Sequence, residues 1–171
     1  MIYIRNHHRK DIPYRITWLN DELVNKYLGG DPKVKTTEKR QQEWFDRYEK
    51  SKDKKFFTIC DEKIPVGFMG LTKIDKANKH ADIFIAIGAS AYRGKGFGRA
   101  ALSYLIDFGF NTLKLHKLSL SVAAENLKAV KFYKKSGFKL EGKIKDDYFD
   151  ENKFHDTYLM ALFPSNKKNN A

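Results

Sequence analysis

The feature that most constrains the fold is a strand-like run that leads through a glycine-rich turn into a helix-like run. The run ADIFIAI, residues 81–87, is rich in β-branched residues and predicts a strand. The segment AYRGKGFGRA, residues 91–100, follows it with three glycines at alternate positions. Apolar residues then recur at helical spacing, which predicts a helix over about Gly98 to Leu113. The domain must therefore combine strands and helices around this turn.

The rest of the chain extends the same mixed pattern, with no internal repeat and no linker. The periodicity predicts strands at residues 2–4, 56–60, 66–74, 118–122, 138–144 and 158–163, and helices at about 11–27, 37–51 and 127–136. A break is expected at Gly29–Pro32, and the acidic, aromatic segment DDYFDENKFHD is expected to be a loop joining the last two strands. We therefore predict one α/β domain over residues 1–171, with a core at about 2–163 and a polar tail at 164–171.

Composition narrows the class of protein further. Hydrophobic residues make up 42% of the chain and aromatic residues 14%, so a packed core rather than disorder is expected. A single cysteine, Cys60, excludes a disulfide framework or a multi-cysteine metal site. There is no signal-peptide pattern and no apolar run of membrane-spanning length, so a cytoplasmic protein without membrane contact is predicted.

The formal net charge of +12 predicts a surface that attracts polyanions. Nucleic acid, an acidic membrane and phosphorylated small molecules all remain candidates on charge alone. The lysines are spread along the chain, so the charge is equally compatible with a role in solubility.

The glycine-rich turn predicts an anion site. First-turn amides of a helix have no intrahelical partner, and the helix dipole adds partial positive charge there. Glycines let a phosphate approach the backbone, and Arg93, Lys95 and Arg99 add full charges, so a diphosphate is the expected ligand. The spacing matches neither a P-loop nor the GxGxxG dinucleotide motif. Taken alone, the glycines are also compatible with a turn that serves only the fold.

Two motifs together resemble the GNAT superfamily of N-acetyltransferases. The loop Arg93-x-x-Gly96-x-Gly98 resembles that family's R/Q-x-x-G-x-G/A acetyl-CoA motif, and Asn126 to Phe138 resembles its later N-x-x-A-x-x-x-Y-x-x-x-G-F motif. The likeness covers about residues 55–163. It is strongest for the branch that holds ribosomal-protein N-terminal, spermidine and amino-sugar-nucleotide acetyltransferases. The segment at 88–92 is one residue longer than in the spermidine enzymes.

The resemblance implies a fold, a donor and a set of site residues. It implies a mostly antiparallel central sheet flanked by helices, with a splayed pair of strands at the acetyl-CoA site, and acetyl-CoA as donor with no metal. Pantetheine would bond to the exposed backbone of Ile85, Ala86 and Ile87, and Asn126 would contact the cofactor arm. The diphosphate would be held by the loop amides, which are those of Arg93, Gly94, Lys95, Gly96, Phe97 and Gly98. Members of this family often form homodimers, so the resemblance also implies a possible homodimer.

The expected reaction is attack of a neutral primary amine on a thioester. The protein must then position both partners, accept the amine proton and protonate the leaving thiolate. The resemblance places Tyr133 near the sulfur as the general acid, whereas its alternative role is aromatic packing on a helix. Asp82, at the start of ADIFIAI, is the candidate base through water, with His80 as a weaker candidate; a solvated carboxylate is the alternative for Asp82. Asn126 is also a good N-cap, and the two roles are compatible.

The sequence leaves the acceptor open between a protein N-terminus, an amino-sugar nucleotide and a polyamine. The acidic, aromatic segment at 146–151 could line an amine site, whereas the positive net charge opposes a polycation at long range. Two alternatives to an acetyltransferase are a basic nucleic-acid-binding module and an inactive acetyl-CoA-binding protein. The first would need exposed aromatic residues among its cations.

Overall fold

The computed structural model describes residues 1–28 and 34–165. The expected break at Gly29–Pro32 and residues 166–171 of the expected tail lie outside these ranges. The helices are α1 Ile12–Leu19, α2 Glu22–Asn25, α3 Glu38–Lys50, α4 Phe97–Asp107 and α5 Leu127–Lys135. The strands are β1 Ile2–Asn6, β2 Lys55–Asp61, β3 Ile64–Asp75, β4 His80–Ile87, β5 Lys117–Ala123, β6 Lys139–Asp150 and β7 Lys153–Leu162. None of the helices within the described ranges is long and apolar enough to cross a bilayer.

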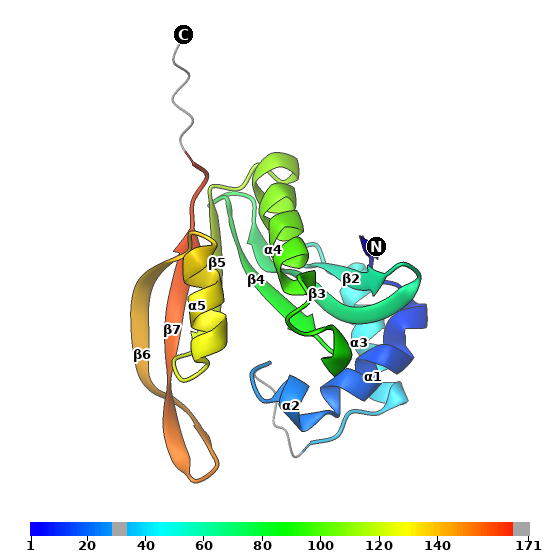
Figure 1. The fold of residues 1–171 in the computed structure, drawn as a ribbon. Coiled ribbons are helices and arrows are strands. Elements are labelled where there is room, and N and C mark those ends of the chain that lie inside the picture. Colours follow the sequence, from blue (N-terminus) through cyan, green and yellow to red (C-terminus); the bar gives the residue numbers. More distant parts are fainter. Residues whose placement is uncertain (29–33, 166–171) are drawn as a thin grey trace.

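The strands form one seven-stranded sheet in the order β1-β2-β3-β4-β5-β7-β6 (Figure 1). Every neighbouring pair is antiparallel except β4 and β5, which are parallel. The prediction of a mixed, mostly antiparallel sheet flanked by helices is therefore confirmed.

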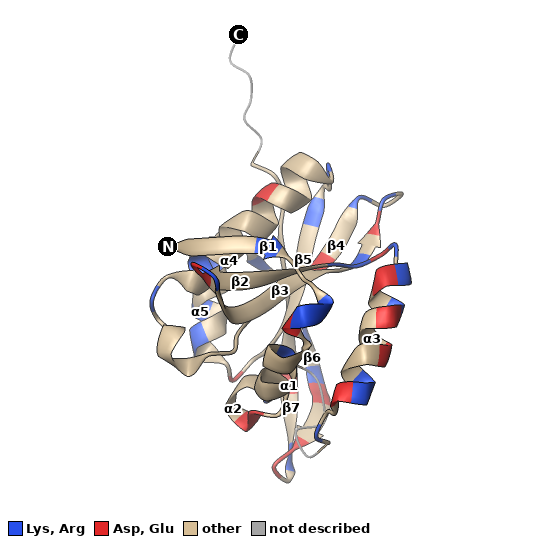
Figure 2. Ribbon diagram, turned by 90° about the vertical axis from the view of Figure 1, so that its right-hand side faces the viewer, with Lys and Arg blue, Asp and Glu red and all other residues tan. Residues whose placement is uncertain are grey.

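Helices cover both faces of the sheet. Successive side chains of a strand point to opposite faces, and β2 shows this directly. The Phe56 ring stacks on Tyr48 of α3 with ring centroids 4.9 Å apart, whereas the Phe57 ring meets Tyr104 of α4 edge-on at 5.0 Å. Figure 2 shows α1 and α3 on one side of the sheet and α4 and α5 on the other. The main core lies between the sheet and α4.

The two parallel strands separate along their length. β4 pairs with β5 only at the register His80–Asp82 with Lys117–Ser119, and the pairing ends there. From Ile83 onward, the edge of β4 that faces β5 therefore has no strand partner. The expected splayed pair of strands is confirmed, and it opens a gap in the middle of the sheet.

The segment at 146–156 corrects the sequence prediction of a loop. β6 and β7 continue through it as a long hairpin, with Tyr148 opposite His155 and Phe149 opposite Phe154. The turn residues Glu151 and Asn152 have φ values of 48° and 61°, which is the conformation of a tight two-residue hairpin turn. The prediction failed because the edge strand β6 is exposed along almost its whole length and so lacks alternating apolar residues.

Two helix boundaries also differ from prediction. The first helical section divides at Asn20, because the Asp21 side chain accepts hydrogen bonds from the amides of Leu23 and Val24 and starts α2. The helix α4 ends at Asp107 and passes into a π-helical turn over Phe108–Thr112. Helix α3 begins after Thr37, whose hydroxyl accepts from the Arg40 amide, close to the predicted start.

Candidate active site in the gap between β4 and β5

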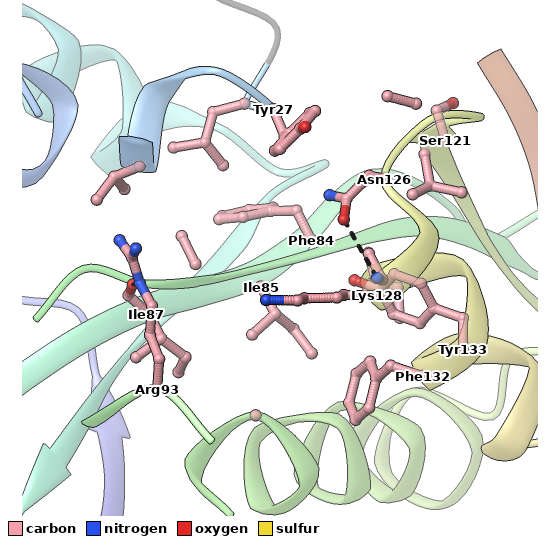
Figure 3. A pocket seen from close by; sticks show the side chains of 18 of the residues that line it. Tyr27, Phe84, Ile85, Ile87, Arg93, Ser121, Asn126, Lys128, Phe132 and Tyr133 are labelled. Carbon is pink, nitrogen blue, oxygen red and sulfur yellow. Dashed lines mark hydrogen bonds between the residues drawn. The ribbon is translucent and has the colours of Figure 1, made fainter. Parts of the chain in front are cut away.

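A cavity of about 440 Å³ fills the gap where β4 and β5 separate (Figure 3). One wall is the unpaired edge of β4, the opposite wall is β5 with the start of α5, and a third is α2 with the residues after it. The lining residues are Leu23, Val24, Tyr27, Leu28, Ile83, Phe84, Ile85, Ala86, Ile87, Arg93, Gly98, Ser121, Val122, Ala123, Asn126, Lys128, Ala129, Phe132 and Tyr133. Apolar side chains dominate, as they do in sites that hold an extended small molecule.

The glycine-rich loop presents free amides beside this cavity. Gly94 and Gly96 have φ values of 77° and 89°, a left-handed conformation that favours glycine. Gly96 is the N-cap of α4, and the first backbone bond of that helix runs from the Ala100 amide to the Gly96 carbonyl. The amides of residues 97–99 precede this bond, so the helix leaves them without a partner. This arrangement suits an anion.

Gly98 differs from the other two glycines of the loop. It lies within α4, where a side chain is conformationally allowed, and an added Cβ would come no closer than 4.0 Å to the Phe132 ring. Neither backbone strain nor packing requires glycine there. What the missing side chain provides is open space at the mouth of the cavity.

Asn126 caps α5 as predicted. Its Oδ1 accepts a hydrogen bond from the Ala129 amide at 3.2 Å, which leaves the side-chain NH₂ group available to donate. Figure 3 shows this side chain at the edge of the cavity with the capping bond drawn. One residue can therefore start the helix and contact a bound ligand.

Tyr133 lies on the α5 wall. Its ring packs against the rings of Phe132 and Phe138, with centroids 5.2 and 5.6 Å away. Burial raises the pKa of Tyr133 to about 12. The phenol is therefore protonated at every pH at which the protein would work, as a proton donor must be.

Asp82 does not line the cavity. It sits where β4 is still paired with β5, opposite Ser119, one residue before the strands separate. Its Oδ2 lies 2.9 Å from the Lys73 Nζ atom. His80 lies further back in the same paired segment, with Nε2 4.0 Å from the Asp75 carboxylate. The geometry therefore does not bring either base candidate to the cavity. The other predicted residues that line it are Ile85, Ala86, Ile87, Arg93, Gly98, Asn126 and Tyr133, whereas Gly94, Lys95, Gly96 and Phe97 do not line it.

The cavity also contains residues that sequence reasoning did not single out. The sequence predicts Leu23 and Tyr27 only as apolar positions of a helix. Lys128 was one of many dispersed lysines, and nothing in the sequence distinguished it. Within the described ranges the lining carries two cations, Arg93 and Lys128, and no carboxylate or imidazole.

The acidic hairpin of β6 and β7 lies beside one end of this site. The Lys26 Nζ atom, next to α2, is 3.5 Å from the Glu151 carboxylate at the hairpin turn. At the base of the turn, the His155 Nδ1 atom is 2.9 Å from the Glu125 carboxylate, and Tyr148 stacks on the His155 ring. Glu125 directly precedes Asn126, so the hairpin contacts both walls of the cavity.

Comparison with known proteins gives consistent matches. The family model described as acetyltransferase (GNAT) domain matches residues 2–139. Spermidine N(1)-acetyltransferase of Escherichia coli K12 is 28% identical over 163 residues, covering 95% of this chain and 86% of its own. The corresponding Vibrio cholerae enzyme is 32% identical over 119 residues, covering 70% and 68%.

The fold comparison agrees. The crystal structure of spermidine N-acetyltransferase from Vibrio cholerae, in complex with CoA and spermine, superposes with a TM-score of 0.89 at 27% identity. The match covers 95% of each chain.

Proposed function

This chain belongs to the GNAT acetyltransferase family and is an acetyl-CoA-dependent N-acetyltransferase, and we propose that its acceptor is a polyamine that attacks the thioester directly. The observation that carries the proposal is the cavity between β4 and β5, with free amides at one end and the acidic hairpin at the other. The donor enters along one wall and the acceptor from the opposite side.

The donor's diphosphate is assigned to the amides of residues 97–99, with those of Gly94 and Gly96. The Arg93 and Lys95 amides of the same loop already donate to the carbonyls of Ser90 and Tyr92. Pantetheine then runs along the unpaired edge of β4 at Ile85, Ala86 and Ile87, whose peptide groups supply hydrogen bonds. Asn126 donates from its free NH₂ group to the same arm. The thioester then lies beside Tyr133, which donates its phenolic proton to the thiolate as it leaves.

The acceptor must lose a proton before or during attack. A primary amine has an ordinary pKa near 10.4, so most of it is protonated at neutral pH. The described wall contains no carboxylate or imidazole. We therefore assign proton removal to water rather than to Asp82 or His80. We assign polarisation of the thioester carbonyl to a backbone amide of β4, which donates a hydrogen bond to the carbonyl oxygen.

Two features support a polyamine as the acceptor. The relatives with the spermidine name match along most of the chain. The hairpin turn places the Glu151 carboxylate 3.5 Å from the Lys26 Nζ atom beside α2, and the neighbouring Asp150 pairs with Lys153 across the hairpin. Carboxylates this close to the cavity can offset the net positive charge within a short distance. The phosphates of an amino-sugar nucleotide would instead be repelled by the carboxylates at the hairpin turn.

The direct test is a titration with acetyl-CoA followed by an activity assay over several amines. Saturating acetyl-CoA, at about 100 times its dissociation constant, should stabilise the protein by about 2.7 kcal/mol. Release of free thiol should then be fastest with spermidine or spermine, compared with an N-terminal peptide amine and an amino-sugar nucleotide. A preference for either of the last two would contradict the polyamine assignment while leaving the acetyltransferase class intact.

A further inference from the structure

One ion pair joins α2 to the hairpin at the acceptor end of the cavity. Lys26 directly follows α2, and its Nζ atom lies 3.5 Å from a carboxylate oxygen of Glu151 at the hairpin turn. Figure 1 shows α2 and the tip of the hairpin at the same end of the molecule. The next residue, Tyr27, lines the cavity (Figure 3). The ion pair therefore lies where an acceptor would pass between the two elements.

The surroundings of the Lys26 ammonium suit a cation. The Nζ atom lies 5.8 Å from the centre of the Tyr27 ring, and the face of an aromatic ring attracts positive charge. The charge of Glu151 raises the pKa of Lys26, and the charge of Glu125 adds to this effect. Two carboxylates and one aromatic ring therefore stabilise a positive charge at this position.

The group that occupies this position has the chemistry of the proposed acceptor. A lysine side chain is a primary ammonium on a flexible four-carbon stem, and the aminobutyl end of spermidine has the same atoms. Lys26 therefore shows how an aminobutyl cation can sit between Glu151 and Tyr27. A polyamine whose distal ammonium took this place would have to displace Lys26 first.

We propose that Lys26 competes with the acceptor for Glu151 and thereby lowers the affinity for polycationic amines. Before the acceptor binds, the Lys26 ammonium pairs with Glu151; the distal ammonium of a bound polyamine replaces it, and Lys26 turns to solvent. The exchange costs little, because the two side chains are 33% and 63% exposed and an exposed ion pair is weak. This inference rests on the proposed polyamine acceptor and adds a residue that opposes its binding.

The test is a double-mutant cycle that measures KM for spermidine at saturating acetyl-CoA. Lys26→Met removes the charge and keeps most of the apolar stem, and Glu151→Gln removes the carboxylate charge at nearly constant shape. The two single variants and the double variant are compared with the wild type. Lys143→Met is the matched control, because Lys143 pairs with the Asp156 carboxylate of the same hairpin and does not line the cavity.

Lys26→Met should lower KM for spermidine by about threefold, which corresponds to the loss of one exposed ion pair that binding must break. Its kcat and its KM for acetyl-CoA should change by less than about twofold, because the donor end of the site is unaltered. Glu151→Gln should raise KM for spermidine by about threefold, and Lys26→Met should then have little further effect. Lys143→Met should change KM for spermidine by less than about 1.5-fold.

Three results would overturn the competition. A higher KM for Lys26→Met would mean that the ion pair positions the hairpin for the acceptor, and an unchanged KM would remove Lys26 from the site. An equal fall in KM with and without the Glu151 carboxylate would make Lys26 a remote repulsive charge. If the wild-type protein does not acetylate spermidine, the polyamine assignment itself fails, whereas failure of the competition alone leaves spermidine turnover intact.

Discussion

At the scale of single residues, Tyr133 shows how packing sets chemistry. Its ring is held by two neighbouring phenylalanines, and burial raises its pKa to about 12. A phenol in this state donates a proton and does not accept one. The same packing that would suit a purely structural residue therefore also fixes its protonation state, and only substitution separates the two roles.

Tyr133→Phe should lower kcat by about 100-fold, because the leaving thiolate loses its proton donor. The affinity for acetyl-CoA should change by less than about twofold, since most of the ring contacts persist. Free-thiol release under saturating donor measures the first quantity, and calorimetric titration measures the second. Full turnover by the variant would show that Tyr133 only packs.

The pH profile should rise without a falling limb up to about pH 10. More free amine is available as pH approaches the ordinary amine pKa, near 10.4. A proton donor with a pKa of about 12 stays protonated over this range, so its ionisation does not lower the rate. A decline in kcat/KM for the amine between pH 8 and 9, with the protein still folded, would indicate a different acid.

Two glycines of the loop should respond oppositely to alanine. Gly96 has a φ of 89°, so Gly96→Ala should destabilise the protein by about 1–2 kcal/mol and weaken acetyl-CoA binding. Gly98 is helical, so Gly98→Ala should stabilise the protein by about 0.5–1 kcal/mol, and its small methyl group should leave binding nearly unchanged. Urea denaturation and titration with acetyl-CoA measure both effects. Equal destabilisation by the two changes would contradict the conformational argument.

At the scale of elements, the parts of the site near the sheet centre could be predicted from sequence and the parts at its edges could not. The strand at 81–87 and the glycine turn were predictable because buried strands and left-handed turns restrict residue type. The Asn126 cap was predictable for the same local reason. The hairpin of β6 and β7 was not, because an exposed edge strand has no apolar alternation.

One signal for the hairpin was nevertheless present. Phe149 and Phe154 are placed symmetrically about the turn, and they pair across the strands with ring centroids 5.0 Å apart. That α2 and Lys128 line the cavity could not be predicted in this way, because it depends on which elements meet in space. The position of Asp82 depends on where strand pairing stops, which no local pattern specifies.

The junction between β1 and α1 depends on a buried polar cluster. Asp11 accepts two hydrogen bonds from Arg5, at 2.6 and 2.7 Å, and one from the Thr58 hydroxyl at 2.8 Å. The His7 Nδ1 atom lies 2.8 Å from the same hydroxyl. Burial and the nearby Arg15 lower the pKa of His7 to about 4. Burial opposes ionisation of Asp11, but its hydrogen bonds outweigh it and lower its pKa to about 2.

This cluster predicts loss of stability in acid. The unfolded chain binds a proton at His7 near pH 6.5 and at Asp11 near pH 3.8, whereas the folded protein does so only near 4 and 2. The free energy of unfolding should therefore fall as pH drops through 6.5 to 4 on account of His7, and through 3.8 to 2 on account of Asp11. Between pH 7 and pH 5, His7 accounts for about 2 kcal/mol.

His7→Gln keeps a group that can hydrogen-bond to Thr58 and removes the titration. Urea denaturation at pH 7 and pH 5 should therefore show a smaller pH dependence for this variant than for the wild type, even if it is less stable at pH 7. An unchanged difference between the two pH values would mean that other groups cause the acid loss.

At the scale of the whole molecule, the net charge of +12 acts differently on the two substrates. The cations and acids are mixed on some elements, as Figure 2 shows along the outer face of α3. Charges are mixed less evenly around the cavity. Arg93 and Lys128 line it, and the Glu151 carboxylate of the hairpin turn lies beside it, next to Lys26. Under the proposed function, the net positive surface attracts acetyl-CoA, whereas the carboxylates of the hairpin turn attract a polycation.

Raising salt should therefore reduce kcat/KM for acetyl-CoA more than kcat/KM for spermidine. Acetyl-CoA carries roughly four negative charges, and the protein's field concentrates it at the site over distances that salt screens. Between about 0.05 M and 0.5 M salt we expect about a tenfold loss for the donor. Screening has opposing effects on spermidine, because it weakens attraction by the hairpin and repulsion by the rest of the surface. S-acetylpantetheine, with no phosphate, is the matched donor and should show little salt dependence. If the two donors respond equally to salt, the positive surface does not steer the coenzyme, and its charge serves solubility alone.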